Sequence, residues 1–203
     1  AANADNNSNV TVTVTDSEFN ANEDEGEITI ETNKANEVTA IADNVAGGMV
    51  GAAGMGATVS DNGSSVINLT GNTMQANNNI DVTAKTDSVL TAEILNGAVG
   101  TFAAGAVSAA MVDAGSDNNR MVTAVNIGSG NTFAAQNINF NADSDITQNI
   151  DMLAFSVSGT YSASGNGTDL AAYTEASVTA DANNTYKGAS DDENGNVDFE
   201  ASN

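Results

Sequence analysis

Carboxylates are the most abundant side chains in this sequence that could do chemistry. Asp and Glu number 27 against four Lys and Arg, which gives a formal charge of −23 at pH 7, and histidine and cysteine are absent. The sequence therefore lacks the usual general base, the most reactive nucleophile and the common zinc and copper ligands. Its charge repels phosphate backbones and anionic lipid surfaces. We expect a protein that is not an enzyme, holds no cofactor or dedicated metal ion and binds no nucleic acid.

Calcium binding is the chemistry that acidic loops suggest first. The stretch SDDENGN, Ser190–Asn196, lacks the first Asp and the distal Glu of an EF-hand loop, and the nonapeptide of calcium-binding β-rolls is absent from the sequence. We interpret the loop carboxylates as solvated turn residues, with weak, nonspecific binding of divalent cations as the alternative. These carboxylates include Asp61, Asp117, Asp191, Asp192 and Glu193.

Two further ligand-binding patterns are incomplete. Paired carboxylates can hydrolyse glycosides, and acidic β-helices include polysaccharide-cleaving enzymes, but such sites need aromatic sugar platforms and basic residues. The sequence has six Phe, three Tyr, no Trp and four scattered cations. The glycines of GGMVGAAGMG, from Gly47 to Gly56, lack the lysine and the hydroxyl residue of a phosphate-binding loop. We therefore expect the functional sites to be surfaces.

The elements that position those surfaces are repeated. One half-unit, called B, occurs four times, starting at Val10, Val66, Val122 and Val178. A large apolar anchor recurs at intervals of 53 to 59 residues, and a two-residue alternation follows each anchor. The anchors are Phe19, Met74, Phe133 and Tyr186, and the alternations are Ile28/Ile30, Ile80/Val82, Ile138/Phe140 and Val197/Phe199.

Half-unit B has the pattern of strand, turn and strand. Short β-branched or aromatic runs are separated by Asn, Asp, Gly and Ser. In VTVTVT, which begins at Val10, three valines lie on one face of the expected strand and three threonines on the other. We therefore expect half-buried strands.

A second half-unit, called A, lies between the B copies and starts at Val38, Leu90 and Leu153. Its first copy contains VAGGMVGAAGMGATVS, Val45–Ser60, in which both faces of an extended chain are small and largely apolar. Glycine and alanine let neighbouring layers approach closely, so we expect a strand covered on both faces.

A membrane helix is the alternative for half-unit A. The second copy contains ILNGAVGTFAAGAVSAAMV, Ile94–Val112, which is uncharged and has small residues at GxxxG-like spacing. Glu93 and Asp113 flank this run, basic flanking residues are absent, and the third A copy is too polar to insert. These features favour strands.

The half-units alternate as B-A-B-A-B-A-B, which is typical of stacked architectures. We expect one repetitive all-β domain, 1–203, whose strand-turn-strand units are stacked as a β-solenoid, as β-arches or as a β-sandwich sheet, with Gly/Ala strands buried on two faces. The B half-units span about 10–36, 61–87, 116–145 and 178–203, and the A half-units about 37–60, 88–115 and 146–177.

The text GAVGTFAAGAVSAAMVDAG, followed by VTAVNIGSGNTFAAQNINFNADS, resembles repeats of large secreted β-solenoid surface proteins, the filamentous-haemagglutinin and leukotoxin-like adhesins. The resemblance covers roughly Val38 to Asn203 and rests on composition. It implies a solenoid fold and a place at the cell surface. By type, an acidic chain of this length is also similar to the amyloid-like sheath proteins of methanogenic archaea, which implies an assembling subunit.

We expect an extracellular structural protein whose partner is itself, assembling through strand edges into a filament, tubular sheath or surface layer. The alternative is a passenger segment of a secreted adhesin that binds host or glycan surfaces. The polar start AANADNNSN is typical of a mature protein after signal-peptide removal, so we expect an extracellular or cell-surface location without membrane insertion. The expected assembly interface comprises Val10, Val12, Val14, Gly51, Ala53, Gly54, Gly56, Gly100, Ala104 and Gly105.

The N-terminal B half, Val10–Thr32, is in excess of the A halves. It either caps the stack of its own chain or joins a sheet of the next subunit.

Overall fold

The computed structural model describes residues 1–188 and 195–203, and these residues form strands and no helix. The prediction of an all-β protein is confirmed, and Val45–Ser60 and Ile94–Val112 are strand as expected. The strands are β1 (Ala2–Asn6), β2 (Val10–Thr15), β3 (Glu18–Ala21), β4 (Ile28–Asp61), β5 (Ser65–Thr70), β6 (Thr73–Ala76), β7 (Asn79–Ala114), β8 (Met121–Ile127), β9 (Thr132–Ala134), β10 (Asn137–Ser158), β11 (Tyr161–Ala172), β12 (Thr174–Ala180), β13 (Thr185–Lys187) and β14 (Asn196–Ser202).

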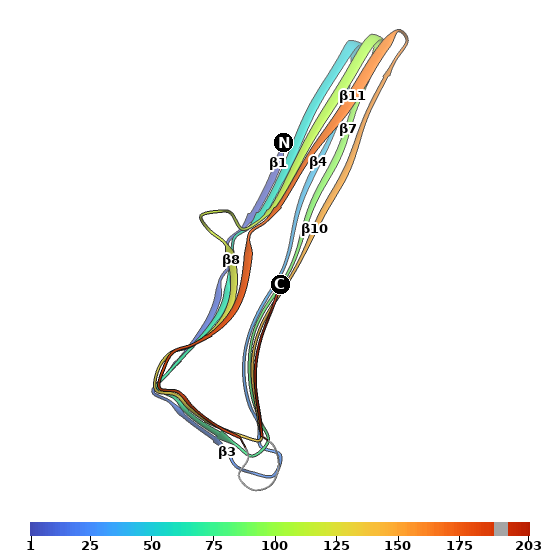
Figure 1. Ribbon diagram of the computed structural model, residues 1–203. Coiled ribbons are helices and arrows are strands. Elements are labelled where there is room, and N and C mark those ends of the chain that lie inside the picture. The colour runs from blue at the N-terminus through green and yellow to red at the C-terminus, as the bar shows by residue number, and fades with distance from the viewer. Residues whose placement is uncertain (189–194) are drawn as a thin grey trace.

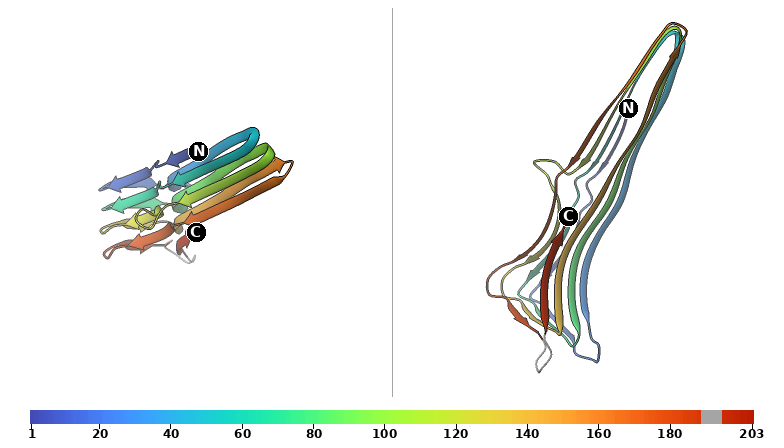
Figure 2. Two further views of the ribbon diagram at one scale, coloured as in Figure 1. Left: turned by 90° about the horizontal axis from the view of Figure 1, so that it is seen from above. Right: turned by 45° about the vertical axis from the view of Figure 1, so that its right-hand side comes forward.

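The chain passes repeatedly through the same positions, which Figures 1 and 2 show as superposed layers. A long strand rises from a roughly triangular base, turns at a tip and descends, so β4 and β7 each supply two limbs, whereas β10 and β11 supply one each (Figure 1). We call the limbs outside the base the blade. Its ascending limbs are 35–48, 87–100 and 145–158, and its descending limbs are 50–61, 103–114 and 161–172.

Every ladder between two strands of the described residues is parallel. One sheet has the order β12-β8-β5-β2 and a second has the order β13-β9-β6-β3. The third contains the limbs in the order β1-β4-β7-β10-β14, with β11 beside β7. Matching parts of successive repeats therefore lie side by side.

The anchors of half-unit B pair as the sequence predicts. Phe19 pairs with Met74, Met74 with Phe133, and Phe133 with Tyr186. The predicted start of the third A copy at Leu153 is wrong, because Leu90 pairs with Gln148 and not with Leu153. The B starts are also shifted by one to three residues, since these strands carry no large anchor at their first position. Val10 pairs with Ser65, and Val66 pairs with Thr11 and Ala124. Val122 pairs with Glu175, and Val178 pairs with Val125.

Large apolar side chains fill the base. Phe133 and Phe140 are almost fully buried, and their ring centroids lie 5.1 Å apart in an edge-to-face arrangement. Tyr186 stacks on Phe133 at 5.5 Å, and Phe199 stacks on Phe140 at 5.1 Å. Aromatic pairs of this geometry contribute about 0.5–1.5 kcal/mol each beyond the burial of their area. The alternation predicted for B strands thus places its apolar side chains in one continuous core.

The interior of the blade becomes smaller toward the tip. Its lower part buries Val59, Leu90, Ile94 and Val112, whereas the buried apolar side chains of its upper part are all alanines. Small side chains let the two limbs approach each other closely. Asn96 lies between the limbs, and its Nδ2 donates a hydrogen bond to the carbonyl oxygen of Val107 at 2.8 Å.

The prediction that the Gly/Ala strands are buried on two faces is wrong for the single chain. Along β4, Ala53, Ala57 and Val59 face the opposite limb and are buried, whereas Ala52 and Gly54 are exposed. The reason is that the two limbs of one half-unit cover each other, so each limb receives cover on its inner face only. The outer face remains apolar and open to solvent.

An asparagine ladder runs through a corner of the base. Asn72 donates through Nδ2 to Oδ1 of Asn131 at 3.0 Å, and Asn131 donates to Oδ1 of Asn184 at 3.1 Å. The backbone N–H groups of Asn72 and Asn131 donate to the same oxygens. Asn72 and Asn131 are buried, so these bonds satisfy groups that would otherwise be costly. The turn residues of half-unit B therefore also hold its register.

Candidate functional site

The structure divides the expected interface residues among three environments. Val10, Val12 and Val14 lie on β2 and are half-buried, and Val12 and Val14 pack against the base core. Gly54, Gly56 and Gly105 lie on the outer face of the descending limbs, as the burial pattern shows. The remaining four face the inside of the blade and are covered by their own chain; they are Gly51, Ala53, Gly100 and Ala104.

The close backbone contacts at the tip explain why residues 51 and 100 are glycines. A Cβ atom at Gly51 would lie 2.5 Å from the carbonyl oxygen of Val99, and one at Gly100 would overlap the carbonyl oxygen of Ala103. The ladder between β4 and β7 shifts register between Gly48 and Val50. These two glycines therefore allow the long strand to turn, and they are not free to contact another molecule.

Both ends of the sheets leave strands that pair on one side only. Within the described residues these are β1, β2, β3 and the part of β4 before Ala57 at one end, and β11, β12, β13, β14 and the part of β10 after Asp143 at the other. Phe19 at the first end is 36% exposed and Phe199 at the second is 46% exposed, although the middle members of both rows are buried. Leu170, in the row of buried Val112, is 52% exposed. A further layer would cover this apolar surface.

The backbone of β2 alternates between its own chain and the open edge. Val10 N–H donates to Ser64 O at 2.8 Å, and Asp16 N–H donates to Thr70 O at 3.0 Å, so even-numbered residues bond to the neighbouring layer. In a parallel ladder the N–H and C=O of one residue point to the same side of the strand. Thr11 and Thr13 therefore present both groups to the open edge. The segment Val10–Thr32 thus pairs with its own chain and still has a free edge.

Lys34 and Asp61 form a buried ion pair that sequence reasoning missed. Lys34 Nζ lies 2.6 Å from Asp61 Oδ2, and the side chains are 1% and 0% exposed. Asp61 also accepts hydrogen bonds from Ser88 Oγ at 2.9 Å and from the N–H of Gly63 at 3.1 Å. The interpretation of Asp61 as a solvated turn residue is wrong, because the turn of β4 at the tip brings the end of this strand back to its start. The sequence contains one indication of this burial: Lys34 lies two residues from Thr32 and two from Asn36, so all three side chains point to the inner face of the strand.

The two outer faces of the blade differ in charge. On the ascending limbs Glu93 pairs with Asp151 in the ladder, and Asp43 lines the same hollow of about 250 Å³. The descending limbs carry Asp113 and Asp169 near the base. Burial, followed by the charge of Asp169, raises the pKa of the Asp113 carboxyl above its ordinary value. The upper part of the descending face is therefore the uncharged one.

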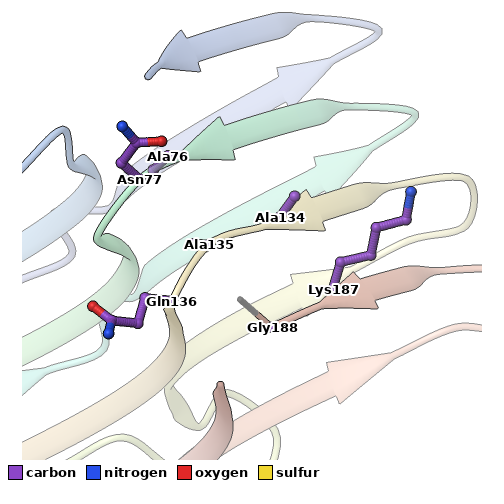
Figure 3. Close-up of a pocket in the computed structure, with 7 residues that line it drawn as sticks. All are labelled: Ala76, Asn77, Ala134, Ala135, Gln136, Lys187 and Gly188. Carbon is purple, nitrogen blue, oxygen red and sulfur yellow. The ribbon is translucent and has the colours of Figure 1, made fainter. Parts of the chain in front are cut away.

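The hollows of the base have polar or small linings. One of them has a volume of about 360 Å³, and its lining includes Ala134, Ala135 and Lys187 from neighbouring layers (Figure 3). A larger hollow, of about 650 Å³, is lined by asparagines and by Arg120, which comes from the loop after β7. Asp117 lies in that loop and is exposed, as expected of a turn residue. The acidic stretch Ser190–Asn194 lies outside the described residues.

Comparisons with known proteins return no match: no family model, no curated protein and no solved structure is significantly similar to this chain. The described residues contain no helix that is long and apolar enough to cross a membrane.

Proposed function

We propose that this chain is an extracellular structural protein with a β-solenoid fold, and that its copies add end to end through strand edges into a filament, sheath or surface layer. One observation carries the proposal: the repeats stack in parallel register, and both ends of the stack leave open strand edges. An open edge is a template for another strand. Parallel repeat arrays expose such edges unless a cap covers them.

The rows of the two ends match each other. Val12, Ile67, Val125 and Val178 occupy one row, so Val178 of one copy meets Val12 of the next when the row continues. By the same rule, the exposed ring of Phe199 meets Ile30 of the next copy. End-to-end addition therefore continues both the hydrogen-bonded ladder and the apolar core.

One charged contact opposes this addition. Glu31, Thr83, Asn141 and Glu200 share a row, so the carboxylate of Glu200 faces that of Glu31 in the next copy. Like charges directly opposite each other in a ladder are destabilising. Assembly therefore strengthens with salt or divalent cations and weakens on chelation at low ionic strength. Glu200→Gln is expected to lower the salt concentration that assembly requires.

Continuing the rows also leaves part of one blade layer unfilled at each junction. In that layer, β14 of one copy pairs with residues 137–143 and ends in the base below the ascending limb, and β1 of the next supplies only the end of a descending limb, pairing with residues 57–61. A second copy of residues 35–56, appended after Asn203, would fill the layer. Assembly should then begin at lower protein concentration than with an appended scrambled sequence of the same composition.

Thr13→Pro is the direct test of edge addition. Proline cannot donate a hydrogen bond, and Thr13 presents its N–H to the open edge, so the substitution blocks the edge without breaking a bond within the chain. We expect wild-type chains to form regular polymers by electron microscopy, with a 4.7–4.8 Å repeat along their axis, and the variant to remain folded but short. Val12→Pro is the control, because it removes an internal bond and destabilises the fold itself. Wild-type monomers at every salt concentration, or unaltered polymers of Thr13→Pro, would contradict the proposal.

The adhesin passenger remains the second candidate function. It is favoured by the hollow lined by Asn7, Asn9, Asn62, Asn119 and Arg120, because amide and guanidinium groups bind sugar hydroxyls and carboxylates. Glycan-array binding that Arg120→Ala abolishes would support this function. The array experiment is independent of polymer formation.

A further inference from the structure

The outer side of the descending limbs forms a flat, apolar surface. We call it the descending face and define it as the outward side chains of residues 50–58, 103–111 and 161–169. These side chains are mostly Gly and Ala; Val107 lies at the centre and is 64% exposed, and the larger side chains Val50, Met111 and Tyr161 lie at the upper and lower borders. The structure describes every residue of this face. Its one charged residue is Asp169, at the lower border. A shallow hollow of about 370 Å³ lies over Gly56, Ala109 and Gly167.

Two glycines of this face are not required by the fold of the chain. A Cβ atom at Gly54 or Gly165 would meet no atom within 4 Å, and neither glycine has a positive φ. Gly97 on the ascending face is different, because a Cβ there would overlap the ring of Phe155. Glycine within a strand is destabilising and often marks close approach by another backbone or ligand. No part of the chain within residues 1–188 and 195–203 makes that approach to Gly54 or Gly165.

We propose that the descending face is a docking surface for the same face of a second copy. The argument for this occupant begins with charge. Two chains of net charge −23 repel each other least where carboxylates are absent, and the ascending face carries Asp43, Glu93 and Asp151 at comparable height. The descending face is the only broad side of the blade that meets this condition.

Shape also fits a second copy. Val107 lies in one ladder row between Gly54 and Gly165, so a raised side chain has a bare backbone on both sides. Two such faces related by a two-fold axis place the Val107 of each copy over a glycine of the other. This is the self-complementarity that an isologous contact requires.

The size of the face predicts a weak contact. Three strands at about 4.8 Å spacing and nine residues at about 3.3 Å rise give about 430 Å² for each copy. The total of about 860 Å² lies below the standard size of a specific, stable interface. A two-fold contact also closes at two copies, so we expect a concentration-dependent dimer. This contact goes beyond edge addition, which is open-ended and does not stop at a defined number.

A lipid surface is the competing occupant. The chain's negative charge opposes binding to anionic membranes, and the open strand edges of β4 and β11 beside this face would lack hydrogen-bond partners in hydrocarbon. A second copy covers the apolar surface without placing those strand edges in lipid. Vesicle binding is therefore an outcome that would overturn the proposal.

The test uses Gly54→Val and Gly165→Val in sedimentation and thermal-unfolding experiments. Valine fills open space in the chain and favours strand, so the melting temperature should stay constant or rise. The same side chain would hold two descending faces apart, so the dimer association constant should fall at least tenfold. If Gly54 and Gly165 had a structural role alone, the association constant would not fall while the melting temperature stayed constant or rose. Unchanged association in both variants would overturn the proposal.

Matched charge variants complete the experiment. Val107→Glu on the descending face should abolish dimers, whereas Val45→Glu on the ascending face, where the valine is similarly exposed at 60%, should not. Measuring dimers in the Thr13→Pro background separates this contact from edge addition. Equal effects of the two Glu variants, or flotation of the wild type with phosphatidylcholine vesicles that Val107→Glu abolishes, would refute the docking of a second copy.

Discussion

Breaking the buried ion pair should destabilise the end of the stack that contains β1 and β2. Lys34→Met keeps most of the side-chain volume but removes the ammonium group that lies 2.6 Å from Asp61. Removing one partner of a buried pair costs about 3–5 kcal/mol, because it leaves an uncompensated charge in the interior. Asp61 keeps hydrogen bonds from Ser88 and Gly63, so we expect the lower end, about 3 kcal/mol. Urea unfolding followed by circular dichroism measures this loss.

The matched control copies the next layer of the stack. Lys34 pairs with Thr86 and Asp61 pairs with Ala114, so Lys34→Thr/Asp61→Ala gives the first layer the residues of the second. The double variant buries no charge and should be more stable than Lys34→Thr alone. A double-mutant cycle with no coupling between the two positions would refute the reasoning. It would mean that the pair is solvated in the folded chain.

Three further changes test the core, the ladder and the blade. Asn131→Ala should lower the free energy of unfolding by about 1–3 kcal/mol, because it leaves buried donors of Asn72 without an acceptor; urea unfolding would show it, and an unchanged midpoint would contradict the ladder. Asp113→Asn should raise the melting temperature at pH 7 but not at pH 3: the raised pKa of this carboxyl means that stability is lost as pH rises from the ordinary value through the folded one. Equal shifts at both pH values would contradict this. Ala53→Glu should cost several kcal/mol, since Ala53 is 8% exposed between the limbs; a folded variant with unchanged melting temperature would show that the limbs can separate.

Comparison of the repeats within the sequence predicted the base better than the blade, and side-chain size explains the difference. The anchors Phe19, Met74, Phe133 and Tyr186 are the largest side chains of their strands, so their spacing identifies the row they share. The third A copy offers Ser, Gly, Asn and Thr, which give no such marker, and its alignment was wrong. Burial on two faces was also predicted wrongly, because composition indicates how close a neighbour can come and not whether that neighbour is present.

The contact between the start and the end of the long strand β4 was not predictable from local patterns. Asp61 lies in a polar stretch that is typical of a solvated turn, and only the return of β4 to its own starting point brings Lys34 beside it. The open edges follow from the number of layers and from the order of the strands. They require the topology, which composition does not contain.

The glycines of the blade serve separate purposes that one sequence run cannot distinguish. Gly51 and Gly54 stand three residues apart in the same stretch, yet the first is required by the carbonyl group of Val99 and the second contacts nothing in its own chain. The base meanwhile buries the large side chains, so most of the hydrophobic stabilisation comes from a region distant from the outer blade. Substitutions on the descending face should therefore leave the fold intact. Loss of association in such variants would then report on the contact between copies and not on unfolding, which makes the blade the part of this protein where assembly and stability can be measured separately.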